Sequence, residues 1–334
     1  MSVRFFRISA VLIPILMWIS CIRSEMAQEP GIQEDSSISR PISILEKNTL
    51  FTVYGRSFNR APILGRLGTY SNFEDMDVDI RPWVKGIDQR NGEKGVIPAL
   101  HLIYGMAIPC TPGDDCLLYL EGIVKDIVGT YIEPAAKRGW MVVLDTQLGK
   151  SNPVQQVKRI IDKGYLKYDN VIVAIDPEFR VREGSETPGR PIGTVHSSEI
   201  NEVQRLLHDY VATHGMSRKK ILIVHQFGDS NVNDGVPFMI QNKKSLRTYD
   251  NVDLVICADG LGKQAVKVVK YNRMTDAEVY PFIQFRGIKL FFPNPWERHE
   301  HYDKPPMNLG QLFGLQPVEG GARMQTQPDV IIIA

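Results

Sequence analysis

Short apolar runs rich in β-branched residues recur along the chain, with longer mixed segments between them. In the run Val171–Ile175, five apolar residues lead directly into Asp176 and, two residues later, Glu178. A continuous apolar run of this length is typical of a strand that is buried on both faces of a parallel sheet. Eight such runs, taken with their polar ends, are predicted as strands: residues 50–56, 96–104, 140–145, 171–179, 221–226, 252–259, 288–292 and 330–334.

Several of the segments between these runs have apolar residues at helical spacing, which predicts helices over 117–137, 153–161, 197–214 and 261–274. Strands that alternate with helices predict a parallel sheet. Eight strands fit a single closed (β/α)8 barrel, the TIM-like architecture, whose usual length of ~250 residues matches 50–334. No helical segment follows the last run, so the final barrel helix is expected to be missing or replaced by the N-terminal segment.

The N-terminus has the pattern of an export signal. Arg4 and Arg7 precede an apolar run from Ile8 to Ser20. A membrane span takes about 20 apolar residues, so this run is too short for one and fits the core of a signal peptide. Cys21 follows at once, in a stretch that resembles the cleavage box of bacterial lipoproteins, where the cysteine becomes the lipidated first residue. Cleavage after Ala27 is the alternative.

The expected organisation is therefore a signal peptide at 1–27, with lipoprotein-type cleavage before Cys21 as one route, a polar linker at 28–48 and the barrel domain at 49–334. The protein is expected to be exported, and to be periplasmic, anchored to a membrane as a lipoprotein, or secreted.

Composition adds two constraints. With 43% hydrophobic residues, 23% charged residues and a net charge of +1, the chain is typical of a soluble globular domain and gives no support to nucleic-acid binding. Cys110 and Cys116 flank a turn-rich loop and would form a disulfide in an oxidising compartment. A metal site at these cysteines is the weaker alternative, because no second Cys or His pair follows at zinc-finger spacing. Cys257 lies in an apolar run and is expected to be a buried thiol.

Polar residues stand at the carboxyl ends of most predicted strands, the end at which (β/α)8 enzymes carry their active sites. These residues are Arg56, His101, Tyr104, Asp145, Gln147, Asp176, Glu178, His225, Gln226 and Asp259, with Asn294 and Trp296 beyond the seventh strand.

Asp176 and Glu178 are the candidate catalytic pair. Residues two apart on an extended strand point the same way, with Cα atoms ~6.6 Å apart, and Pro177 favours extended geometry before it. Each negative charge raises the pKa of the other carboxyl, which can keep one of them protonated as a general acid. The alternatives are ligand binding without chemistry and a strand end that is ion-paired with Arg180 or Arg182.

The other rim residues are candidate substrate contacts: Asp145, Gln147, His225, Gln226, Asp259, Arg56, Tyr104 and Trp296. Each of them also has a purely structural interpretation. Aspartate is common in turns, whereas histidine and aromatic side chains are often buried in the core. His101 is expected to pack inside. The chain has no Gly-x-Gly-x-x-Gly, phosphate loop or Gly-x-Ser-x-Gly elbow. The pair in His299-Glu300-His301 lies in a loop rich in Pro and Asp, so no metal and no cofactor is expected.

An Asp-x-Glu at the end of the fourth strand resembles chitinase-type glycoside hydrolases. That resemblance implies that Glu178 protonates the glycosidic oxygen and that Asp176 assists it. Ala174 departs from the pattern, because chitinases have a further Asp at that position.

A longer set of motifs looks like an uncharacterised family of exported bacterial barrel proteins, many with lipoprotein-like signals. The motifs are Ala174–Phe179, Ile192–Val195, Glu199–Asn201, Val224–Phe227, Ala258–Gly260 and Gly287–Phe291. The resulting hypothesis is an exported glycoside-hydrolase-like barrel that acts on a polysaccharide or cell-envelope glycan by carboxylate acid/base catalysis. The alternative is a non-catalytic envelope lipoprotein, held at the membrane by a lipid anchor, whose barrel binds glycan or a partner protein.

Overall fold

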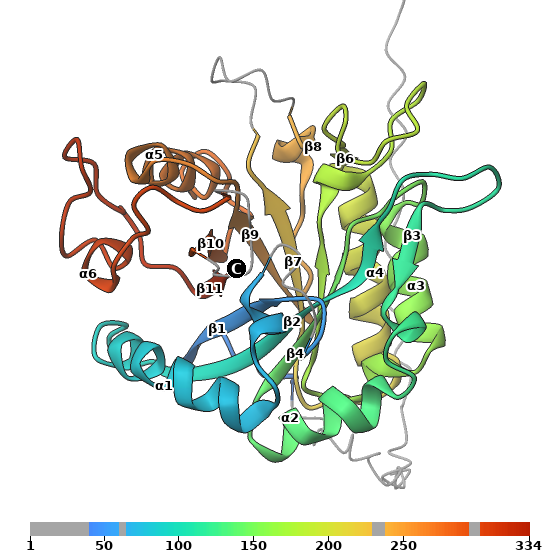
Figure 1. The fold of residues 1–334 in the computed structure, drawn as a ribbon, viewed down its shortest axis with the longest axis horizontal. Helices are drawn as coiled ribbons and strands as arrows, with labels where there is room; N and C mark the ends of the chain where they lie inside the picture. The colour runs from blue at the N-terminus through green and yellow to red at the C-terminus, as the bar shows by residue number, and fades with distance from the viewer. Residues whose placement is uncertain (1–39, 60–64, 229–237, 294–300) are drawn as a thin grey trace, which may run out of the picture. The chain divides into compact units, whose positions relative to one another are not determined.

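The structure, a computed structural model, describes residues 40–59, 65–228, 238–293 and 301–334 (Figure 1). Eight parallel strands form a closed barrel in which each strand pairs with its neighbours in the sequence, and β1 pairs with both β2 and β11. The eight strands predicted from the sequence are confirmed. They are β1 (Asn48–Gly55), β2 (Gly95–Ala107), β4 (Met141–Thr146), β5 (Val171–Ile175), β7 (Lys220–Gln226), β9 (Val252–Ala258), β10 (Phe285–Leu290) and β11 (Val330–Ile333).

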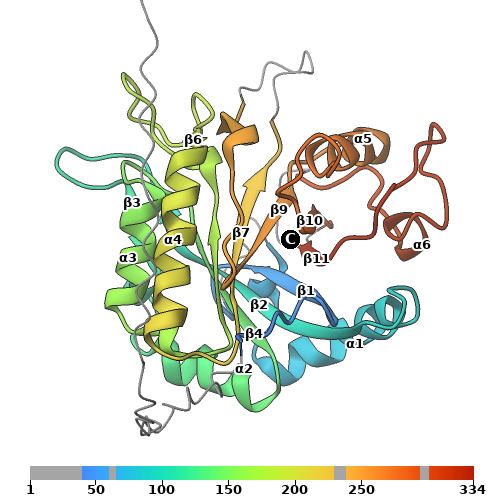
Figure 2. The ribbon, with the colours of Figure 1, turned by 180° about the vertical axis from the view of Figure 1, so that it is seen from behind.

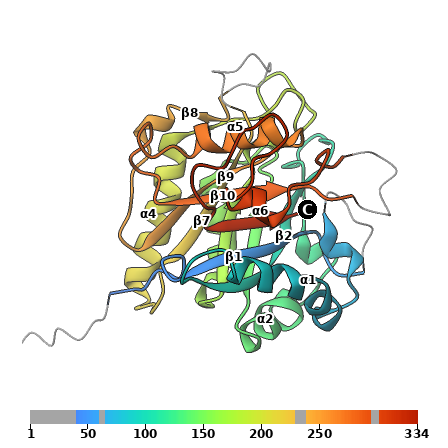
Figure 3. The ribbon, with the colours of Figure 1, turned by 90° about the vertical axis from the view of Figure 1, so that its left-hand side faces the viewer.

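Helices surround the barrel. They are α1 (Phe73–Asp88), α2 (Glu133–Lys137), α3 (Pro153–Asp162), α4 (Ser197–Thr213), α5 (Gln264–Met274) and the short α6 (Leu309–Leu312). Figures 1 and 2 show α3 and α4 together on one side of the strands, and Figure 3 shows α1 and α2 on the side away from α5. The described part of the β7–β9 connection has a two-residue strand, β8 (Ile240–Gln241), and a 3-10 turn, Lys243–Ser245, in place of a helix.

The helix expected over 117–137 is wrong in its first half. Leu117–Tyr119 forms a strand, β3, antiparallel to the end of β2, and the regular helix α2 begins only at Glu133, after a π-helical turn at Val128–Ile132. Pairing with β2 satisfies backbone groups that a helix would have bonded internally. The apolar spacing that suggested a helix instead serves a strand and a turn packed on the same core.

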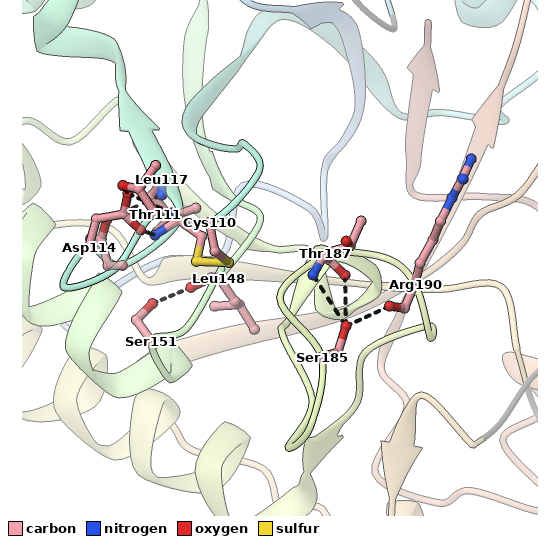
Figure 4. The surroundings of a disulfide bond; sticks show 11 residues. Cys110, Thr111, Asp114, Leu117, Leu148, Ser151, Ser185, Thr187 and Arg190 are labelled. Carbon is pink, nitrogen blue, oxygen red and sulfur yellow. Dashed lines mark hydrogen bonds between the residues drawn. A yellow bond between two sulfur atoms is a disulfide. The ribbon is translucent and has the colours of Figure 1, made fainter.

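A disulfide closes the β2–β3 loop. Cys110 and Cys116 are bonded at 2.03 Å, and Cys257, the free cysteine among the described residues, is buried. The amide of Cys110 donates to the carbonyl of Glu186 at 3.3 Å, so this loop contacts the loop that follows β5. Figure 4 shows Ser185 and Thr187 of that second loop beside the disulfide.

The barrel interior contains an apolar part and a polar part. Side chains alternate along each strand, so one set faces the interior and the other packs beneath the helices. The apolar interior residues include Leu50, Ala99, Val143, Ile172, Ile223, Val255, Val330 and Ile332. Continuing two residues along several strands, toward their carboxyl ends, the same face carries charged or polar side chains. We call that end of the barrel the mouth.

The opposite end of the barrel is covered by residues that precede β1. Ile42 forms a parallel bridge with Arg218, just before β7, and Leu45 is fully buried. The last part of the segment expected as a linker, 40–48, is therefore packed against the barrel. The expected signal peptide and Cys21 lie outside the described residues. None of the helices that the structure describes combines the length and apolarity needed to cross a bilayer.

Replacement of both Cys110 and Cys116 by Ser should lower the free energy of unfolding by about 2 kcal/mol, because the bond restricts a short loop in the unfolded chain. Urea unfolding followed by circular dichroism measures the difference. A reducing agent should destabilise the wild type and leave the double variant unchanged. Identical midpoints for the two proteins under oxidising conditions would contradict a stabilising role.

Candidate functional site at the barrel mouth

The polar part of the interior is a continuous set of contacts across several strands. Asp145 on β4 lies between His101 on β2 and His225 on β7. Its Oδ2 atom is 3.1 Å from Nε2 of His101 and 3.3 Å from Nε2 of His225. All three residues are fully buried. We call the set of His101, Asp145, Asp176, His225, Asp259 and Lys289 the polar layer.

The contacts continue from His225 to the next two strands. Nδ1 of His225 is 2.9 Å from Oδ2 of Asp259, at the end of β9, and Nζ of Lys289 on β10 lies 3.2 Å from the same oxygen. The Lys289 ammonium also lies 3.8 Å from the centre of the Tyr54 ring. Two anions and two cationic groups thus alternate, which offsets the cost of removing their charges from water.

The pKa shifts within the layer follow from this alternation. Burial opposes ionisation of Asp145, but the charge of His225 beside it and the hydrogen bond with His101 hold the pKa of Asp145 well below its usual range. Burial also opposes the charged form of His225, yet Asp145 and Asp259 raise the pKa of His225 above its usual value. For His101, burial dominates and lowers the pKa to about 4, against the effect of its hydrogen bond with Asp145.

Asp176 and Glu178 are not related as the extended-strand prediction supposed. β5 ends at Ile175, and Pro177–Phe179 forms a 3-10 turn. Oδ1 of Asp176 accepts the backbone N–H of Glu178 at 3.2 Å, so Asp176 caps the turn that carries Glu178. Asp176 is buried at 2% exposure, whereas Glu178 is partly exposed. The two carboxyl groups therefore lie at different depths.

The pKa values of both carboxyl groups are raised above their ordinary values. Burial, helped by the charges of Asp176 and Asp259, raises the pKa of Glu178 to about 8, and Lys289 opposes the shift. Burial raises the pKa of Asp176 to about 6, with His225 opposing. At neutral pH Glu178 holds a proton while most of Asp176 is ionised. This is the division of roles expected of a proton donor and its charged partner.

The turn that carries Glu178 is fixed from outside the layer by Gly193. The N–H of Gly193 donates to the carbonyl of Glu178 at 2.8 Å. A Cβ at this position would lie 2.3 Å from the carbonyl oxygen of Pro177, which leaves no space for a side chain. The motif Ile192–Val195, which contains Gly193, entered the sequence analysis only as a family resemblance. The close contact with the turn explains why a glycine is needed at position 193.

Arg180 supports the same turn. Its guanidinium forms two bonds to the carboxylate of Glu199, at 2.8 and 2.9 Å, and donates to the carbonyl of Thr194 at 3.2 Å. The partner of Arg180 is thus Glu199 at the start of α4. The sequence left open that Arg180 forms an ion pair with Asp176 or Glu178. In the structure its guanidinium pairs with Glu199 instead.

Arg56 and Tyr104, expected as substrate contacts, are engaged elsewhere. The guanidinium of Arg56 donates to the carbonyls of Ile103 at 2.6 Å and Leu118 at 2.7 Å, which joins the backbones of β2 and β3. The hydroxyl of Tyr104 donates to Glu121 at 2.7 Å. Neither side chain contacts the polar layer through a described hydrogen bond.

Two glutamines also stabilise loops at the mouth. Gln147 accepts the backbone N–H of Ala107 at 2.8 Å. Gln226 accepts from Lys243 at 2.8 Å and donates to the carbonyl of Gly228 at 3.2 Å. Trp296, the remaining candidate, lies outside the described residues.

Two members of the layer, His101 and Lys289, and the neighbouring Tyr54 were not assigned a functional role from the sequence. Lys289 had a detectable signal, because a lysine between Ile288 and Leu290 in a buried strand needs a charged partner. Among the residues that the structure describes, the group suited to a metal ion is His101, Asp145 and His225, whose ligand atoms all lie within 4.8 Å of one another.

No family model matches the chain, and no curated protein matches it closely enough to show a relationship. The resemblances noted from sequence motifs therefore remain expectations, and the function must be argued from the site.

Glu178→Gln should stabilise the fold at pH 8 and change little at pH 4. The folded-state pKa of Glu178, about 8, lies above the ordinary glutamate pKa of 4.5, so the folded state keeps a proton that the unfolded chain releases. Stability from this group therefore falls as the pH rises between these values. The uncharged amide removes that loss, and we expect about 2 kcal/mol at pH 8, reduced from the full shift by partial exposure.

Urea unfolding of both proteins at the two pH values measures the effect. Glu183→Gln, in the exposed loop beyond the turn, is the matched control and should give no difference. A Glu178→Gln variant that is less stable than the wild type at pH 8 would show that the carboxylate is ionised and well paired.

Proposed function

We propose that the protein is a glycoside-hydrolase-like enzyme in which Glu178 is the general acid/base and Asp176 its charged partner. The observation that carries the proposal is the position of Glu178. It lies at the mouth, partly exposed, and its pKa is raised to about 8 by burial and by the neighbouring carboxylates. A carboxyl group that keeps its proton at neutral pH and can be reached from solvent is suited to protonating a leaving group.

In the proposed reaction, Glu178 donates its proton to the glycosidic oxygen as the bond from that oxygen to the anomeric carbon breaks. Positive charge develops at the sugar ring, and ionised Asp176 below it stabilises that charge. One water molecule is consumed: its hydroxyl adds to the anomeric carbon and its proton restores Glu178. The polar layer holds Asp176 in a fixed electrostatic environment throughout.

The proposed substrate is a polysaccharide or cell-envelope glycan, and the proposed location is outside the cytoplasm. Glycan chemistry rests on the likeness of Asp176-Pro177-Glu178 to chitinase-type enzymes. Export rests on the N-terminal signal pattern, and the disulfide between Cys110 and Cys116 is consistent with an oxidising compartment.

The second candidate is a barrel that binds glycan or a partner protein without turnover. The depth of the layer favours it, because Asp145 and His225 have no exposed surface and Asp176 has almost none. If these groups only stabilise the fold, Glu178 has no catalytic partner that a substrate can reach.

Glu178→Gln should abolish hydrolysis, with a loss of about 100-fold or more in kcat, because general acid catalysis contributes 10²–10⁴-fold. The mature domain would be screened on envelope glycans and other polysaccharides by release of reducing ends, and glycan binding measured in parallel. Glu183→Gln should keep full activity. Turnover that survives Glu178→Gln removes Glu178 from the mechanism, and binding without turnover by the wild type supports the second candidate.

The pH dependence of kcat/KM should be bell-shaped, with activity falling below about pH 6 as Asp176 gains a proton and above about pH 8 as Glu178 loses one. Asp176→Asn keeps an oxygen to cap the turn but removes a negative charge beside Glu178. The pKa of Glu178 should then fall, so the alkaline limb moves to lower pH. An alkaline limb that stays in place in Asp176→Asn would show that another group sets it.

A further inference from the structure

Two histidines from different strands direct the same ring atom at one carboxylate oxygen. Nε2 of His101 and Nε2 of His225 lie 3.1 and 3.3 Å from Oδ2 of Asp145. The ligand atoms of this group all fall within 4.8 Å of one another. Atoms that bind one metal ion at about 2.0–2.2 Å are separated from each other by roughly 3–4 Å, and both distances from Oδ2 of Asp145 to the histidine nitrogens fall in that range.

The opposite side of each imidazole ring is held by an oxygen. Nδ1 of His225 is 2.9 Å from Oδ2 of Asp259, and Nδ1 of His101 is 3.4 Å from Oγ1 of Thr52. Metal-binding histidines nearly always donate their second N–H to a carboxylate, carbonyl or hydroxyl, which fixes the ring and leaves the other nitrogen free for the metal. With an ion bound, His225 would donate its Nδ1–H to Asp259 and present the Nε2 lone pair to the ion.

Two atoms of the group are left without a hydrogen bond, although both residues are fully buried. Among the described residues, Oδ1 of Asp145 and Nε2 of His225 have no partner that meets hydrogen-bond geometry. An unsatisfied buried polar atom costs about 1–3 kcal/mol, so two in one cluster call for a missing partner. A cation between His101, Asp145 and His225 would supply the partner that Nε2 of His225 lacks.

We propose that His101, Asp145 and His225 bind a divalent transition-metal ion inside the barrel, directly below the mouth. Two imidazoles and one carboxylate form a ligand set used for zinc and for non-haem iron. Lys289 does not compete for the site, because its ammonium pairs with Asp259, on the far side of the His225 ring. The competing state is a proton on His225 that holds the Asp145 carboxylate in place of the ion. The proposal does not rest on glycoside hydrolysis.

The test uses the full chain. After treatment with a chelator, the protein would be titrated with Zn²⁺ in a calorimeter, and its metal content measured by mass spectrometry after dialysis. The expected result is stoichiometric zinc. Asp145→Asn and His225→Ala should weaken binding by more than 100-fold, and Asp259→Asn, which changes only the residue behind His225, by about 10–100-fold. His208→Ala, a histidine outside the layer, should bind as the wild type does.

A measurement on the wild type keeps the test decisive if the ligand variants fail to fold. X-ray absorption of the zinc-loaded protein should show two imidazole nitrogens in the first coordination sphere. Absence of stoichiometric zinc, a coordination sphere without two imidazoles, or undiminished zinc binding by a folded His225→Ala variant would each overturn the proposal. Because none of these readouts is enzymatic, they are independent of whether Glu178 catalyses hydrolysis.

Discussion

Charged groups buried inside a barrel need partners of opposite charge, and this requirement determines the arrangement of the polar layer near the mouth. Asp145 and Asp259 are both buried, and His225 lies between them with Lys289 beyond. Each charge alone would cost several kcal/mol to remove from water, and the cost is offset only because opposite charges lie at hydrogen-bond distance. The closed sheet makes this possible, since strands far apart in the sequence direct side chains to a shared axis.

The same constraint extends to the residues that reach solvent. Glu178 lies at the mouth beside the polar layer, and burial together with the charges of Asp176 and Asp259 raises its pKa. Its position depends on a turn held by Gly193 and by the bond from Arg180 to Glu199. The position of Glu178 at the mouth therefore depends on contacts with Gly193 and with the start of α4, outside the barrel.

The fold could be predicted from the sequence because each barrel strand contains a short, mainly apolar run, and such runs can be recognised without knowledge of distant contacts. The helix α1 was missed: Pro82 lies inside it and obscures the pattern, although Asn72 caps its start. In 117–137 the apolar spacing indicated a helix, while pairing with β2 decided in favour of a strand.

The site was less predictable, for a physical reason. Strand ends identified which residues approach the mouth, but not their depth or their partners. Asp145, His225 and Asp259 do converge, whereas Arg56 and Tyr104, which stand at the same strand ends, are engaged by backbone carbonyls and by Glu121. The turn at Pro177 also placed Asp176 and Glu178 at different levels, which an extended strand would not do.

The segment before β1 has a consequence for how this domain can be delimited. Ile44 and Leu45 cover apolar side chains at the end of the barrel opposite the mouth, and the ammonium of Lys94 donates to the carbonyl of Leu45 at 2.8 Å. A fragment that began at the first strand would lack Ile44 and Leu45 and would expose the apolar end of the barrel to water. The segment 40–47 therefore belongs to the folded domain and closes this end of the barrel.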